Sequence, residues 1–131
     1  MIANIVVEQT KEGDFSCFIE EDIPYLGLLG YGSSSEEAIN SLIDFYNQSK
    51  EELRAEGKIV PELNFIIHYD MPSFFNRFNF LNQSKIAEKA GINPSLMRKY
   101  TSGVARAGQK QYDKLHAAVQ TLATEMLAAA F

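Results

Sequence analysis

The segment Gln83–Gly103, QSKIAEKAGINPSLMRKYTSG, constrains the fold of this chain more than any other part of the sequence. Asn82 suits the N-cap of a first short helix, and Gly91 supplies the positive φ that a sharp turn needs. Asn93 can cap a second helix beginning at Pro94, a residue whose fixed φ fits the first helical position. The pattern therefore predicts a helix-turn-helix, whose expected packing residues are Ile86, Ala87, Ala90, Ile92, Met97 and Tyr100.

The polar residues of this segment are those that a DNA-reading helix-turn-helix uses. The start of the second helix enters the major groove, where Arg reads guanine and Ser or Asn bonds in either sense. We expect base contacts from Asn93, Ser95, Arg98 and Lys99, and phosphate contacts from Gln83, Ser84, Lys85, Thr101, Ser102 and Arg106. One small reading head rarely binds an operator tightly, so we expect a homodimer or higher homo-oligomer on an inverted repeat. The alternative is a helical pair that binds only protein.

Charge divides the chain into two parts. Residues 1–76 contain four Lys/Arg against fourteen Asp/Glu, a net charge of −10, whereas residues 77–131 contain eight against three, a net charge of +5. The basic part can contact phosphates although the whole chain carries −5. We therefore predict two domains, 1–71 and 72–131, with the boundary at Met71–Pro72.

The N-terminal part has the alternation of strands and then the pattern of one amphipathic helix. Strands are predicted over residues 3–9, 14–21, 28–32 and 63–69. Ser34 and Glu37 have capping-box spacing for a helix that ends at Gly57. The predicted class is α+β, a β-β-β-α-β domain followed by an all-α domain.

Two further helices are predicted around the helix-turn-helix. One covers residues 73–81, with Ser73 as its cap and its Phe side chains packed under the two helices that follow. The other covers residues 109–129 and carries a heptad-like seam of Tyr112, Leu115, Val119, Leu122 and Met126. This seam either covers the helix-turn-helix core or also contacts a second copy.

No residue set has a catalytic or metal-ligating pattern. The N-terminal carboxylates lack metal-ligand spacing with His or Cys, so we interpret them as an acidic surface for a basic protein partner. The contact residues expected on that surface are Glu20, Glu21, Asp22, Glu51 and Glu52. We interpret His68 and His116 as structural and Cys17 as a buried small hydrophobe.

Several absences complete the prediction. A single cysteine excludes an internal disulfide, and the chain has neither a long apolar run nor a signal-peptide pattern at its N-terminus. We expect a cytoplasmic protein that does not contact membranes, has no enzymatic activity and uses no cofactor or metal.

With both parts placed, the chain resembles the HicB antitoxins of bacterial type II toxin–antitoxin systems, in the subgroup ending in a helix-turn-helix. Three passages carry the resemblance: IVVEQTKEGDFSCFIEE, GYGSSSEEAINSL and QSKIAEKAGINPSLMRKYTSG, the last being similar to lambda-repressor-like (Xre-type) domains. The resemblance covers nearly the whole chain. Two features depart from the family: the usual proline-bearing passage after the second strand is here IPYLGLLGYG, which does not align with it, and the helix over 34–57 is long with an acidic end.

The resemblance implies a fold and a function for each part. The N-terminal module would be a partial RNase H-like fold without nuclease activity that masks a small basic HicA-like toxin, an mRNA-cleaving ribonuclease. The C-terminal module would bind double-stranded DNA at the operon's own promoter, which makes the chain an antitoxin and autorepressor. The alternatives are a stand-alone regulator whose N-terminal domain dimerises or senses a ligand, a protein-binding module without DNA, and a hydrolytic enzyme.

Overall fold

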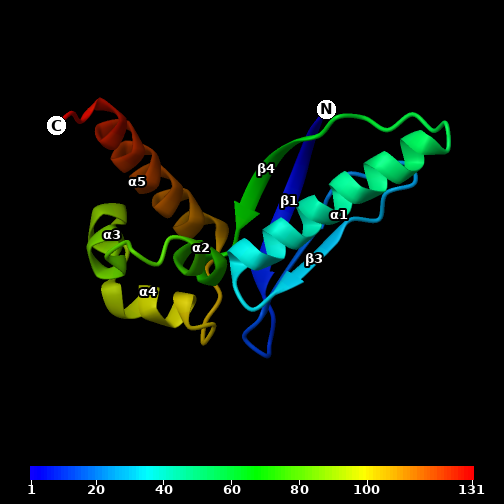
Figure 1. Ribbon diagram of the computed structural model, residues 1–131. Helices are drawn as coiled ribbons and strands as arrows, with labels where there is room; N and C mark the ends of the chain where they lie inside the picture. Colours follow the sequence, from blue (N-terminus) through cyan, green and yellow to red (C-terminus); the bar gives the residue numbers. More distant parts are fainter. The chain divides into compact units, whose positions relative to one another are not determined.

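The computed structural model describes residues 1–131, which form two compact units, Met1–Arg77 and Phe78–Phe131 (Figure 1). The first unit contains β1 (Ile2–Gln9), β2 (Phe15–Ile19), β3 (Leu29–Gly32), α1 (Ser35–Ala55), β4 (Asn64–Tyr69) and α2 (Met71–Arg77). The second unit contains only α3 (Gln83–Ala90), α4 (Pro94–Thr101) and α5 (Gln109–Ala128). The α+β class predicted from the sequence is confirmed. None of the helices combines the length and apolar character needed to cross a membrane.

The sheet of the first unit has the strand order β3-β2-β1-β4. β1 pairs with β2 and β2 pairs with β3 in antiparallel register, whereas β4 lies parallel to β1. A parallel neighbour requires a crossover connection, and α1 provides it between β3 and β4. Alternate residues of β1 face α1, so Ala3, Ile5 and Val7 are fully buried.

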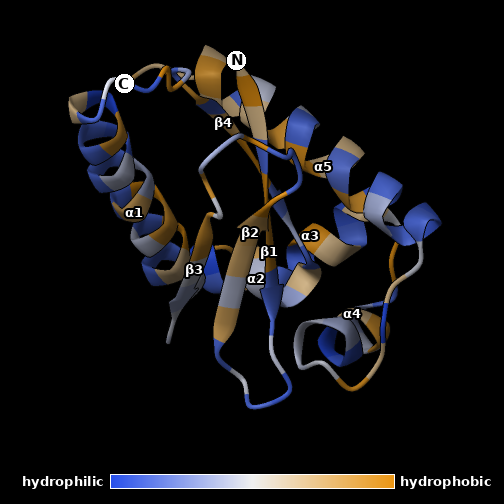
Figure 2. Ribbon diagram, turned by 90° about the vertical axis from the view of Figure 1, so that its right-hand side faces the viewer, coloured by the Kyte–Doolittle hydropathy of each residue, from blue (hydrophilic) through white to orange (hydrophobic).

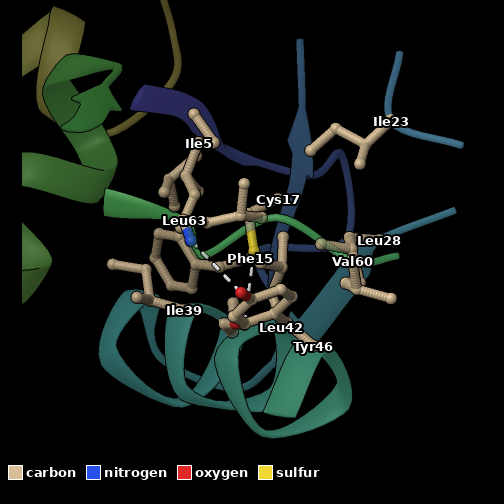
Figure 3. Close-up of a cluster of buried hydrophobic side chains, with 13 residues drawn as sticks. Ile5, Phe15, Cys17, Ile23, Leu28, Ile39, Leu42, Tyr46, Val60 and Leu63 are labelled. Carbon is tan, nitrogen blue, oxygen red and sulfur yellow. Dashed lines mark hydrogen bonds between the residues drawn. The ribbon is translucent and has the colours of Figure 1, made fainter. Parts of the chain in front are cut away.

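The core of the first unit lies between the sheet and α1 (Figure 3). Ala38, Leu42 and Tyr46 form the apolar stripe of the helix and pack against strand residues such as Phe15 and Cys17. The Cys17 thiol donates a hydrogen bond to the Ala38 carbonyl at 3.2 Å, and burial raises the pKa of the thiol to about 11. The prediction of a buried, hydrophobic Cys17 is therefore confirmed.

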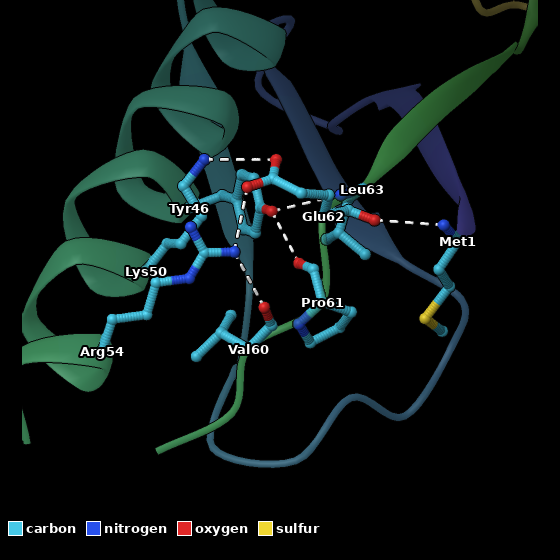
Figure 4. Close-up of polar contacts among 8 residues, drawn as sticks. All are labelled: Met1, Tyr46, Lys50, Arg54, Val60, Pro61, Glu62 and Leu63. Atoms are coloured by element: carbon cyan, nitrogen blue, oxygen red, sulfur yellow. Dashed lines mark hydrogen bonds and ion pairs between the residues drawn. The ribbon is translucent and has the colours of Figure 1, made fainter. Parts of the chain in front are cut away.

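Polar contacts fix both ends of the crossover. At its start, the Ser34 hydroxyl accepts from the Glu37 amide at 3.1 Å, which is half of the expected capping box. The Glu37 carboxylate accepts from the Ser33 hydroxyl instead of completing the box. Past its end, the Tyr46 hydroxyl donates to the Pro61 carbonyl at 2.8 Å and accepts from the Leu63 amide at 3.1 Å (Figure 4).

α2 begins earlier and ends earlier than the helix predicted over residues 73–81. Its cap is Asp70, whose carboxylate accepts from the Ser73 amide at 2.8 Å, and Ser73 itself is fully buried within the helix. The Ser35 hydroxyl donates to the Ser73 carbonyl at 2.9 Å, which binds α2 to the start of α1. The expected role of Ser73 as the cap was wrong, and α2 groups with the first unit rather than with the helices that follow it.

α5 in the second unit packs against α3 through the first part of its predicted seam. Leu115 of the seam is buried, as is Ala118 beside the seam, whereas Met126, near the end of the seam, is 68% exposed. Figure 2 shows polar and apolar residues alternating along α5, as expected for a helix with one covered side. The seam therefore serves as core packing over its first half.

Candidate nucleic-acid interface

The turn between α3 and α4 is built from the residues that the sequence singled out. The Asn82 side chain accepts from the Lys85 amide at 3.1 Å and caps α3. Gly91 ends α3 with φ 72° and ψ 30°, a left-handed conformation that a residue with a Cβ adopts only at a cost. The Asn93 side chain then accepts from the Ser95 amide at 2.8 Å, with Pro94 as the first residue of α4.

The inner faces of the two helices are apolar. Ile86, Ala87, Ile92, Met97 and Tyr100 are buried, as expected, while Ala90 is only partly buried. Ala87 is fully buried, and its small side chain lets the neighbouring helices approach closely. The packing residues therefore direct the polar residues of α3 and α4 outward.

Two side-chain contacts organise the polar residues. The Gln83 side-chain amide donates to the Thr101 hydroxyl at 2.6 Å, which joins the first turn of α3 to the last residue of α4. The Arg98 guanidinium donates to the Ser95 hydroxyl at 3.0 Å along α4. Arg98 and Ser95, both expected from the sequence to contact bases, therefore lie next to each other on α4.

Most of the predicted contact residues are exposed. Gln83 and Thr101, which bond to each other, are partly buried. The remaining eight are exposed: Ser84, Lys85, Asn93, Ser95, Arg98, Lys99, Ser102 and Arg106. Lys85 forms a surface ion pair with Glu88 at 3.6 Å, which a phosphate would have to displace.

The electrostatics favour an anionic ligand at this unit. Residues 78–131 contain seven Lys/Arg and three Asp/Glu, a net charge of +4, whereas residues 1–77 carry −9. Amides in the first turn of a helix have no intrahelical acceptor, and the Asn82 cap engages the amide of Lys85. The amides of Gln83 and Ser84 therefore remain available. Such amides at the positive end of a helix bind phosphate oxygens.

The predicted partner-binding carboxylates fall into two groups that no contact joins. Glu20, Glu21 and Asp22 directly follow β2, whereas Glu51 and Glu52 are exposed on α1. Of these, only Glu21 is held by the fold: the Asn4 amide donates to it at 2.7 Å, and the Asn4 side chain donates as well. These bonds, first the backbone one and then the side-chain one, lower the pKa of the Glu21 carboxyl.

Sequence reasoning missed the open face of the sheet, which lies opposite α1. Phe18, Leu29 and Tyr31 are exposed on this face by 37%, 71% and 57%, and Phe18 lies opposite Leu29 in the register of β2 and β3. The signal was present, because Phe18 alternates with the inward-facing Cys17 and Ile19 in the sequence. His68 also lies on this face and contacts the Asn4 side chain at 2.8 Å.

No three His, Cys, Asp or Glu side chains come together as a metal-binding cluster. Comparisons of the chain with protein-family models, with curated proteins and with solved structures find no match.

Proposed function

We propose that this chain is a DNA-binding transcriptional regulator of the antitoxin type, in which the second unit reads double-stranded DNA through α3 and α4. The observation that carries the proposal is the capped turn at Asn82, Gly91 and Asn93, followed by a helix that exposes Ser95, Arg98 and Lys99. This arrangement suits insertion of the start of α4 into the major groove, with the first turn of α3 at the phosphate backbone.

The test is a titration of DNA from upstream of the chain's own gene, and of random DNA, with the full protein at several salt concentrations. We expect the logarithm of the binding constant to fall linearly with the logarithm of the salt concentration, because phosphate contacts release counterions. Affinity that does not respond to salt would refute DNA binding and leave a protein-binding helical pair.

Arg98→Ala separates base reading from phosphate contact. We expect a loss of about 1–3 kcal/mol on the operator and a much smaller loss on random DNA. Lys11→Ala is the matched control, because it removes one exposed positive charge from the hairpin of the first unit. Equal losses on both DNAs would assign Arg98 to the backbone instead.

We further propose that the first unit binds a small basic protein, such as a HicA-like ribonuclease, which makes the regulator an antitoxin. Support comes from the net charge of −9, from the exposed Phe18, Leu29 and Tyr31, and from the fixed carboxylate of Glu21. Exposed apolar side chains on a unit of negative net charge complement a basic partner, and the charge speeds its association. The β-β-β-α-β order of this unit is also the one expected of a partial RNase H-like fold.

The proposed binding of a small basic protein is tested by isolating the tagged full chain from its native host and identifying the proteins and DNA that co-purify. A small basic protein encoded next to this chain, lost on Phe18→Ser and retained on Asp44→Asn, an exposed acidic residue of α1 outside the expected contact set, would support the antitoxin role. Recovery of DNA without such a protein would instead favour a stand-alone regulator.

A further inference from the structure

β4 is the outermost strand on one side of the sheet, next to β1 (Figure 1). The Asn64 amide donates to the Met1 carbonyl at 2.8 Å, and the Asp70 amide donates to the Val7 carbonyl at 3.1 Å. Even-numbered residues of this region therefore bond to β1, so the backbone groups of Phe65 and Ile67 point away from the sheet. No strand pairs with them.

The opposite edge of the sheet is closed at Tyr31 of the four-residue strand β3. The Tyr31 amide of β3 donates to the Ser41 hydroxyl at 2.9 Å, and the same hydroxyl lies 3.3 Å from the Tyr31 carbonyl. A side chain of α1 thus takes the place of a neighbouring strand at β3. The sheet therefore has one protected edge and one open edge.

The open edge has none of the features that usually prevent strand pairing. Residues 63–69 contain no Asp, Glu, Lys, Arg or Pro, and β4 continues for six residues without a bulge. The charged residues that flank it are already engaged. Glu62 pairs with Arg54 at 2.9 Å and with Lys50 at 3.5 Å, and Asp70 accepts from the amides of Gln9 and Ser73.

The α1 layer over the sheet also stops short at β4. α1 packs over β1, β2 and β3, and it reaches β4 mainly through the edge-to-face contact of Tyr46 with Phe65. Ile5 and Val7 of β1 are fully buried, whereas their partners Ile67 and Tyr69 are only partly buried. On the other face, Ile66 is 47% exposed. A strand beside β4 would therefore bury apolar side chains on both faces.

We propose that β4 pairs in antiparallel fashion with β4 of a second copy across a two-fold axis, joining two four-stranded sheets into one. A second copy can supply hydrogen-bond partners for the unpaired backbone groups of β4. The pairing is not opposed by charge, because an uncharged strand places no like charges opposite each other. The closed β3 edge stops further growth, so the product is a dimer rather than a fibre. The inference concerns the first unit alone and does not depend on DNA binding.

The charge of the first unit gives this dimer a distinctive salt dependence. Each copy brings a net charge of −9 in residues 1–77, so the two copies repel each other at long range. Added salt screens that repulsion, and dimerisation should become stronger as salt rises. DNA binding by the second unit should become weaker over the same range.

The experiment is sedimentation velocity of the full chain over a range of concentrations, at low and at high salt. We expect a monomer–dimer equilibrium that shifts toward the dimer at high salt. Ile66→Lys should weaken dimerisation by about tenfold, because it places like charges together at the strand pair. Ile2→Lys is the matched control: Ile2 is 59% exposed on the same face, but it lies on β1, one strand from the edge.

Hydrogen exchange gives a second readout that does not depend on a variant. The amides of Phe65 and Ile67 should exchange quickly in dilute protein and slowly in concentrated protein, whereas the Ile66 amide should be protected in both. A chain that remains monomeric at all concentrations would overturn the proposal. So would a dimer that leaves the Phe65 and Ile67 amides unprotected. If the chain forms the β4 dimer but does not bind DNA, that result would count against the proposed function and not against this interface.

Discussion

The Gln83 side-chain amide lies 2.6 Å from the Thr101 hydroxyl and donates a hydrogen bond to it, which fixes the first turn of α3 to the last residue of α4. The two residues are 18 positions apart, and the turn at Gly91 lies between them. The contact therefore closes the pair of helices at the end that the turn leaves open.

This contact can be measured by a double-mutant cycle. We expect Gln83→Ala and Thr101→Val each to lower the free energy of unfolding by about 0.5–1.5 kcal/mol, the usual net value of one hydrogen bond. The double variant should lose less than the sum of the two single losses, because both remove the same bond. Urea denaturation provides the values, and strictly additive losses would show that the two side chains do not act together.

Gly91 offers a test of backbone strain that is free of steric overlap. A Cβ added at Gly91 or at Gly27 would meet no atom within 4 Å, but only Gly91 has a positive φ, of 72°. Gly91→Ala should destabilise the second unit by about 1–2 kcal/mol, since an L-residue is strained in this conformation. Gly27→Ala should be neutral or slightly stabilising, because it restricts only the unfolded chain. Equal thermal stability of the two variants would contradict this explanation.

The elements that the sequence predicted well are those whose signals are local. The turn at Gly91 and the caps at Asn82, Asn93 and Ser34 each depend on residues within a few positions, and the structure contains all four. Alternation along β1 and β2 likewise places Val7 and Cys17 in the core, because the side chains of a strand alternate by geometry alone.

The features that the sequence did not predict depend on contacts between distant segments. Asp70 caps α2 but also accepts from the Gln9 amide at 2.9 Å, a residue 61 positions away, and no local pattern indicates that bond. The grouping of α2 with the first unit follows from Ser35 and Ser73 in the same way. The strand order, and hence the open edge at β4, is also set by long-range pairing.

Asp70 should therefore be important for the stability of the first unit. Asp70→Ala removes the acceptor for the Gln9 and Ser73 amides, and we expect a loss of about 1–3 kcal/mol in the free energy of unfolding. Asp44→Ala is the control, because Asp44 is an exposed acidic residue of α1 outside this network. The comparison is made by urea denaturation at neutral pH, and equal stability of the two variants would show that Asp70 is dispensable.

Cys17 should be unreactive in the folded chain and should make stability depend on alkaline pH. Burial raises the pKa of its thiol from 9.0 to about 11, so near pH 8 the folded chain has about a hundredfold less thiolate than the unfolded chain. Alkylation by iodoacetamide should be slow in buffer and fast in concentrated urea.

The unfolded chain releases the thiol proton above about pH 9, whereas the folded chain holds it until about pH 11. The stability that the neutral thiol contributes is therefore present below pH 9 and lost as the pH rises through this window. Because tyrosines and lysines also titrate there, the measurement is the difference in unfolding free energy between the wild type and Cys17→Ala. That difference should shrink as the pH rises from 9 to 11, and a difference that stays constant would contradict the assignment.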